Sequence, residues 1–164
     1  MVLYYWWRDE SADEVLWPIS TMNMHWFFKG TQMGLLGGLG TGLLVGISRK
    51  GATTQSLVHD ATRYLKWGGQ MGIPYTAVKN VSDNAQVSLD TLKERAYALE
   101  MNTWHNRIDT GTLIGAIVGR IALNDPRIWM ATWGMSKSQV IPACGTYAGA
   151  FAGMALLLPL YFVS

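Results

Sequence analysis

A chain of 164 residues fits a single domain, and only 15% of its residues are charged, against about 25% in typical soluble proteins. This composition leaves little water-facing surface, and the eight Trp and seven Tyr residues are typical of aromatic belts at membrane interfaces. A formal net charge of +2 without a basic run argues against nucleic acid as a partner, and the single cysteine, Cys144, excludes an internal disulfide.

Residues 1–25 are expected to form an amino-terminal tail. The opening stretch MVLYYWWRDESADEV is aromatic and then acidic. A mitochondrial transit peptide is rich in Arg and poor in acidic residues, and a secretory signal needs a longer apolar run. No cleavable presequence is therefore predicted, and import would depend on internal signals.

The first predicted helix covers residues 26–47 and carries glycines at intervals of four residues: Gly30, Gly34, Gly38, Gly42 and Gly46. Four residues advance a helix by slightly more than one turn, so these glycines share one face. In water, each glycine would lower the stability of the helix by about 1 kcal/mol relative to alanine. In a bilayer the helix persists because unpaired backbone groups are costly in hydrocarbon, and the small residues let another helix approach closely. The rival interpretation, a phosphate-binding loop, lacks the preceding strand and the Gly-Lys-Ser/Thr ending.

Three further helices are predicted over residues 64–82, 107–123 and 138–162. The last is long and uncharged, which is typical of a membrane span, whereas the segment 64–82 is weak by hydropathy because it contains Lys66 and Lys79. It is retained because all three segments repeat the glycine spacing of the first. The glycines concerned are Gly68, Gly72, Gly111, Gly115, Gly119, Gly145, Gly149 and Gly153.

Residues 84–103 are expected to form a solvated helical connection, since their apolar residues lie near helical spacing with charges between them. The predicted fold class is therefore all-α. The expected architecture is a four-transmembrane-helix bundle over residues 26–162, packed through the glycine ladders (GxxxG) of its helices.

The charges of the connections predict the orientation of the bundle. The first loop, residues 48–66, and the third, residues 120–137, both carry more basic than acidic residues, whereas residues 79–109 are slightly acidic. By the positive-inside rule, the first and third loops face the matrix or cytoplasm. Both termini and the middle connection then lie on the opposite side.

The titratable residues do not suggest catalysis or a metal site. His25, His59 and His105 are scattered along the chain without a metal-binding spacing, and each is interpreted as an interfacial or solvated histidine. Asp109 is a candidate proton carrier, because ionisable residues inside a membrane are often functional. We favour a structural interpretation, in which the helix dipole and the nearby Arg107 stabilise Asp109 in the first turn.

Two arginines form a candidate lipid site. Arg120 lies one turn from the basic-side boundary of the third segment and can extend to the headgroups. Together with Arg127 it could bind the phosphates of cardiolipin, since basic pockets on the matrix side suit that lipid. Simple membrane anchoring is the alternative, and no other cofactor is predicted.

The third segment carries a family resemblance. In the stretch TWHNRIDTGTLIGAIVGRIAL, Asn106 precedes Gly111 and Gly115 by five and nine residues, and Arg120 lies near the end. This pattern resembles the second half of the mitochondrial inner-membrane translocase (Tim) superfamily, and the resemblance extends over roughly residues 26–160. It implies a four-helix membrane core.

Within that superfamily the chain most resembles the Tim-like membrane accessory subunit of mitochondrial respiratory complex I. The similar features are the acidic tail, the glycine-paired first helix and the KWGGQMG entry to the second. The resemblance implies a multi-pass inner-membrane protein with both termini in the intermembrane space. It would be a non-catalytic scaffold of NADH:ubiquinone oxidoreductase, in contact with membrane-arm subunits, phospholipid and neighbouring respiratory complexes. The alternative is a subunit of an inner-membrane protein translocase.

Overall fold

A computed structural model of the protein describes residues 18–161, which form helices and turns without a strand. The helices are α1 (Pro18–Ser48), α2 (Thr54–Asn84), α3 (Leu89–Met101), α4 (Thr103–Ala122), α5 (Pro126–Trp133) and α6 (Cys144–Tyr161). The all-α class is thus confirmed for this part of the chain. Residues 1–17, which make up most of the expected tail, and residue 162, the expected end of the last helix, lie outside the described residues.

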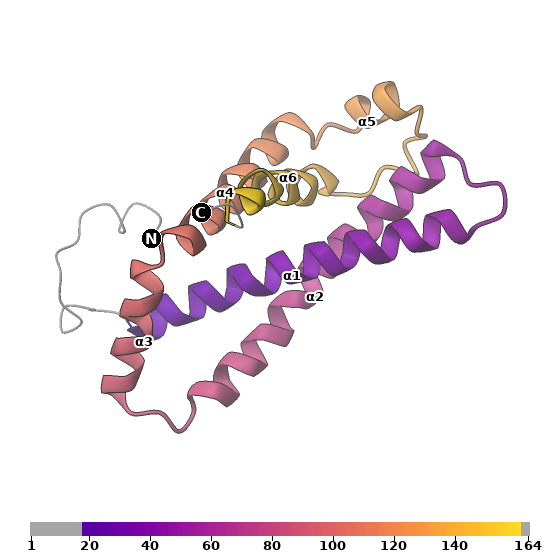
Figure 1. The fold of residues 1–164 in the computed structure, drawn as a ribbon. Coiled ribbons are helices and arrows are strands. Elements are labelled where there is room, and N and C mark those ends of the chain that lie inside the picture. Colours follow the sequence, from indigo (N-terminus) through magenta and orange to yellow (C-terminus); the bar gives the residue numbers. More distant parts are fainter. Residues whose placement is uncertain (1–17, 162–164) are drawn as a thin grey trace.

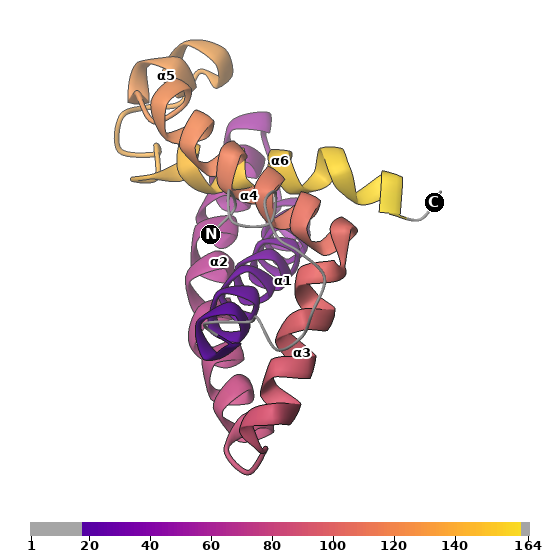
Figure 2. The same ribbon diagram turned by 90° about the vertical axis from the view of Figure 1, so that its left-hand side faces the viewer.

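The helices are arranged as two antiparallel pairs, α1 with α2 and α4 with α6 (Figure 1). The loop between α1 and α2 and the connection around α5 lie at the same end of the molecule, which we term the α5 end. Helix α3 packs against the first turns of α1 at the opposite end, the α3 end. Figure 2 shows α3 leading from the end of α2 to the start of α4.

Helices α1 and α2 touch through their backbones. Gly34 lies against Gly68, and Gly30 against Gly72, so that a Cβ added to any of these four glycines would overlap a carbonyl oxygen of the other helix or a side chain beside it. Small residues permit this approach, because any larger side chain would hold the two backbones apart. The same face of α1 continues against the first turns of α2 through Gly38, Gly42 and Gly46.

Helices α4 and α6 cross in the same way. Three glycines of α4 meet three of α6 in antiparallel order: Gly111 with Gly153, Gly115 with Gly149 and Gly119 with Gly145. A Cβ on Gly149 would overlap the carbonyl oxygen of Gly115, and one on Gly115 would overlap that of Gly149. Each pair is therefore locked in a single register, since a shift by one residue would place side chains at the contact.

The two pairs meet through an apolar core at mid-height. Leu35 of α1, Leu65 of α2 and Ala150 of α6 form this core, and Leu35 is fully buried. The ring of Tyr147 packs against it, where a Cβ on Gly69 would be 3.1 Å from the ring edge. The contact between the pairs thus uses side chains, whereas the contact within each pair uses backbone.

The first two helices begin earlier than the sequence patterns predict. Helix α1 already includes Pro18, the first described residue, whereas the sequence pattern predicts a start at residue 26. Helix α2 starts at Thr54 instead of residue 64. Thr53 and Ser56 form a capping box there, in which each side chain accepts a hydrogen bond from the other residue's backbone N–H, at 3.2 and 2.9 Å.

The later boundaries also follow local capping. Ser88 and Asn102 cap α3 and α4, so the expected connection 84–103 contains the helix Leu89–Met101, and α4 begins at Thr103 instead of residue 107. Residues 138–143 form turns, and α6 starts only at Cys144 because Ala143 has a φ of 62°. Helix α5 is not among the predicted helices, and it begins after the capping residue Asp125.

Length and composition make α1 a candidate membrane span, and no other helix within residues 18–161 passes the same test. The apolar run of α6, Cys144–Leu158, is shorter. The charges of α2, which include Asp60, Lys66 and Lys79, explain its low hydropathy. A span of four helices is thus not evident from hydropathy.

A pair of alanine substitutions on α1 tests the glycine contact. Gly34→Ala should destabilise the fold by about 1–3 kcal/mol, because its Cβ would overlap the carbonyl oxygen of Gly68. Gly37→Ala is the control: nothing lies within 4 Å of its Cβ position, so alanine should be neutral or stabilise the helix by up to about 1 kcal/mol. Chemical denaturation would measure both. Equal effects would show that the close approach does not determine stability.

Candidate functional site

A buried carboxylate links the two helix pairs near the α3 end. Asp109 of α4 is 8% exposed, and its Oδ1 accepts hydrogen bonds from Lys29 Nζ at 3.1 Å and from Gln32 Nε2 at 2.7 Å. Gln32 also donates to Thr112 Oγ1 at 3.1 Å. Lys29 and Gln32 are three residues apart on α1, as are Asp109 and Thr112 on α4, so each pair shares a helix face. We call these four residues the Asp109 cluster.

Two histidines border the Asp109 cluster. His25 Nδ1 lies 3.7 Å from Asp109 Oδ2, and the ring of His25 is 5.5 Å from the ring of His105, measured between centroids. His25 and His105, which are scattered in the sequence, lie together in the structure because the first two turns of α1 are adjacent to the first turn of α4. His59 lies at the α5 end, where its Nδ1 is 2.6 Å from the carbonyl oxygen of Gln139.

The structure also corrects the partner expected for Asp109. Lys29 compensates its charge, whereas Arg107 lies over the ring of Trp104, 4.9 Å from the ring centroid. Asp109 falls in the second turn of α4, because the helix begins at Thr103, so the expected first-turn dipole effect is replaced by a direct ion pair. The sequence patterns do not predict Lys29 as the partner of Asp109. The signal for it is that Lys29 is a single charge in an apolar segment, and such a charge usually has a partner.

A second buried carboxylate lies at the α5 end. Asp60 of α2 is fully buried beneath α1, and its Oδ2 lies 3.0 Å from Nη1 of Arg49, whose side chain is half exposed. The carbonyl oxygen of Asp60 would be 2.8 Å from a Cβ on Gly42. The ion pair therefore fixes the loop between α1 and α2 against the start of α2.

The two arginines of the predicted lipid site are both exposed. Arg120 lies in the last turn of α4, and Arg127 in the first turn of α5. Within residues 18–161, neither side chain has a hydrogen bond or an ion pair to another residue, so both are available to an anion. Binding of cardiolipin there stays a prediction.

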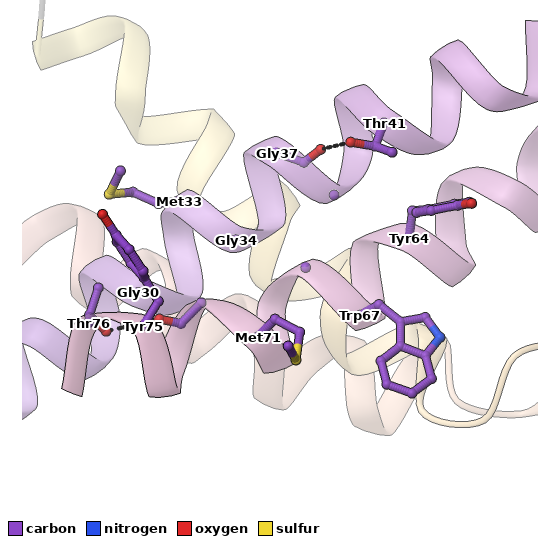
Figure 3. A pocket seen from close by; sticks show the side chains of 13 residues that line it. Gly30, Met33, Gly34, Gly37, Thr41, Tyr64, Trp67, Met71, Tyr75 and Thr76 are labelled. Carbon is purple, nitrogen blue, oxygen red and sulfur yellow. Dashed lines mark hydrogen bonds between the residues drawn. The ribbon is translucent and has the colours of Figure 1, made fainter. Parts of the chain in front are cut away.

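A shallow apolar groove of about 450 Å³ runs along the outer face of the α1–α2 contact (Figure 3). Its floor consists of glycine backbone from both helices, and its walls are the exposed side chains of Met33, Trp67, Met71 and Tyr75. Thr41 at its edge donates its hydroxyl hydrogen to the carbonyl oxygen of Gly37, at 2.8 Å. The groove thus offers apolar surface and few free polar groups.

Residues 18–161 contain no group of three His, Cys, Asp or Glu side chains arranged to hold a metal ion. Cys144 is buried beside Trp129 and Met135 at the α5 end. The features described above are structural: the helices of each pair touch through their backbones, and buried ion pairs join helices.

Removing Lys29 alone should lower the free energy of unfolding more than removing the charges of Lys29 and Asp109 together. Lys29→Met leaves the Asp109 carboxylate buried without a cation and should destabilise the fold by about 3 kcal/mol. The double variant Lys29→Met/Asp109→Asn should recover part of this loss. Lys79→Met is the matched control, because its pair with Asp83 is exposed and should be worth about 0.5 kcal/mol. Additive losses in the double variant, measured by denaturation, would contradict the coupling.

The comparison with known proteins gives a family for most of the chain. Residues 7–140 match the model of a family described as "Protein of unknown function (DUF1757)". The match includes α1 to α5 and therefore the whole Asp109 cluster. No curated protein matches the sequence. The chain belongs to the DUF1757 family.

Proposed function

We propose that the protein is a non-catalytic scaffold subunit of mitochondrial NADH:ubiquinone oxidoreductase, in which α1, α2, α4 and α6 cross the inner membrane. The observation that carries this proposal is the backbone contact within each helix pair, such as Gly34 with Gly68. In hydrocarbon, apolar burial does not drive helices together, and close packing through small residues does. The resemblance to the Tim superfamily at Asn106 and Arg120 is the basis for the mitochondrial membrane and the complex.

The exposed apolar side chains support immersion in a membrane. Leu44, Val78, Ile121 and Leu156 are 72%, 71%, 81% and 76% exposed, and they lie on α1, α2, α4 and α6 respectively. Each of the four proposed spans thus presents large apolar side chains outward. Lipid or the helices of neighbouring subunits would cover them.

The charge distribution supports an orientation. The α5 end carries Arg49, Lys50 and Lys137, whereas the α3 end carries Asp83 and Asp90 among charges of both signs. By the positive-inside rule, the α5 end would face the matrix and the α3 end the intermembrane space. The capped loop between α1 and α2 is short, as a tight connection between two antiparallel spans requires.

The Asp109 cluster favours a scaffold over a proton carrier. A carrier exchanges its proton and its partners during turnover, whereas Asp109 already holds Lys29 at 3.1 Å and Gln32 at 2.7 Å. These partners stabilise the charged form and attach α1 to α4. The cluster therefore contributes to the joint between the helix pairs.

Separation of native membranes tests the assignment to the complex. After gentle solubilisation, a native gel with mass spectrometry should show the chain in the band that oxidises NADH. A Gly115→Leu variant should be lost from that band, because the leucine would overlap the backbone of α6 at Gly149. Val118→Leu, at an exposed position of α4, should assemble normally. Migration with protein-import receptors would contradict the proposal and support the translocase alternative.

Cysteine labelling tests the four spans and their orientation. In a Cys144→Ala background, single cysteines replace Ala52 and Lys137 at the α5 end and Gln86 at the α3 end, all of which are exposed. In mitoplasts, an impermeant maleimide should label only the cysteine at position 86, and the other two should react after the membrane is opened. Labelling of positions 52 and 86 from the same side would remove α2 as a span.

A further inference from the structure

A pocket of about 410 Å³ lies at the α3 end, between α1, the end of α2, α3 and the start of α4. It is separate from the α1–α2 groove and lies at the opposite end of the molecule from Arg120 and Arg127. Its lining combines groups that bind anions with an apolar wall. The lining residues are Met22, His25, Trp26, Asp83, Asn84, Arg95, Ala98, Leu99, Asn102 and His105.

A chain of amide side chains positions Arg95 at this pocket. Asn80 of α2 donates to Asn23 Oδ1 of α1 at 2.6 Å, and Asn84 donates to Asn80 Oδ1 at 2.6 Å. Arg95 Nη1 donates to Asn84 Oδ1 at 2.9 Å. Three helices are thus joined in one polar line that ends at a guanidinium, and this line fixes where the positive charge lies.

The charge of Arg95 has no carboxylate partner within residues 18–161. Its hydrogen bonds go to the Asn84 amide and, at 3.4 Å, to the carbonyl oxygen of Asp83. The Asp83 carboxylate, which also lines the pocket, is paired with Lys79 at 2.9 Å. Asp109, the acid beside His25, is paired with Lys29. Among residues 18–161, the pocket therefore has a cation without a carboxylate partner, and the nearby Asp83 and Asp109 are each paired with a lysine.

The indole of Trp26 is a second, independent sign that the pocket binds a hydrogen-bond acceptor. The indole Nε1 of Trp26 is buried and has no hydrogen-bond partner within the described part of the chain. Lys79 Nζ lies 5.8 Å from the centroid of the same ring, and its charge is paired with Asp83. Buried N–H donors in native proteins are nearly always paired, and Trp26 lines the pocket, so a ligand that accepts a hydrogen bond would satisfy the indole.

We propose that this pocket binds the phosphate group of an anionic amphiphile. Arg95 supplies the charge, the Trp26 indole supplies an N–H donor, and Leu99 belongs to the apolar wall that meets the lipid tail. The Arg95 guanidinium and the Trp26 indole, from α3 and α1, together offer several N–H donors, which suits a phosphate because it has more acceptor oxygens than a carboxylate. The inference goes beyond the proposed scaffold role and does not depend on which complex the protein joins.

Lipid add-back to the full-length, delipidated protein in detergent tests the site. Native mass spectrometry should show tighter binding of phosphatidylglycerol than of phosphatidylcholine. Arg95→Gln should weaken phosphatidylglycerol binding by about ten-fold or more, since a hydrogen-bonded charge is lost. Arg95→Lys, which keeps the charge, should retain most of the affinity and shows that the position tolerates substitution.

Lys93→Gln is the matched control, because it removes the same charge from the same helix at a residue that does not line the pocket. The affinity of this variant for phosphatidylglycerol should stay within about two-fold of the wild type, because Lys93 does not line the pocket. Equal weakening by Lys93→Gln and Arg95→Gln would overturn the proposal, because the binding would then reflect general surface charge.

The indole signal of Trp26 separates the two sources of phosphate. In ¹⁵N-labelled protein, with the signal assigned through Trp26→Phe, phosphatidylglycerol should shift the Nε1–H resonance and inorganic phosphate alone should shift it only weakly. A full shift with inorganic phosphate, together with displacement of the lipid, would support a phosphate site but overturn the amphiphile. No shift with either probe would overturn the site itself.

Discussion

Direct contact between the backbones of crossing helices is the constraint on which the rest of this structure depends. Gly34 with Gly68, and Gly115 with Gly149, leave no room for a Cβ on either side. Because the contact has one workable register, each helix pair behaves as a preformed unit. The fold then has only to join two units, which it does through the apolar core around Leu35 and through polar contacts nearer the ends.

Two buried ion pairs hold parts of the structure together that the glycine contacts do not join. Asp109 with Lys29 attaches α4 to α1 toward the α3 end, and Asp60 with Arg49 fixes the loop of the first pair at the α5 end. Breaking a buried pair by removing one partner costs far more than an exposed pair is worth. Both pairs therefore act as restraints on helix position, which suits a protein whose proposed contribution is shape.

The sequence predicts the contacts within the helix pairs better than the contacts between them. Glycine spacing is a local signal, and it indicates which face of each of the four helices α1, α2, α4 and α6 contacts its partner. The partner of Asp109 is eighty residues away on another helix, so the nearby Arg107 was assigned wrongly. Helix starts were missed where a capping side chain decided them, as at Thr53. The pocket at Arg95 depends on three helices meeting, which no spacing within one segment can reveal.

The glycine faces of these helices meet each other, as Gly34 meets Gly68 and Gly115 meets Gly149. Solid-state NMR of the protein in lipid bilayers, with ¹³C-labelled glycine α-carbons, tests this directly. Single-residue variants would assign the signals. The account predicts cross-peaks that join Gly34 to Gly68 and Gly115 to Gly149, whereas glycine signals with contacts to lipid acyl chains and none to each other would contradict it.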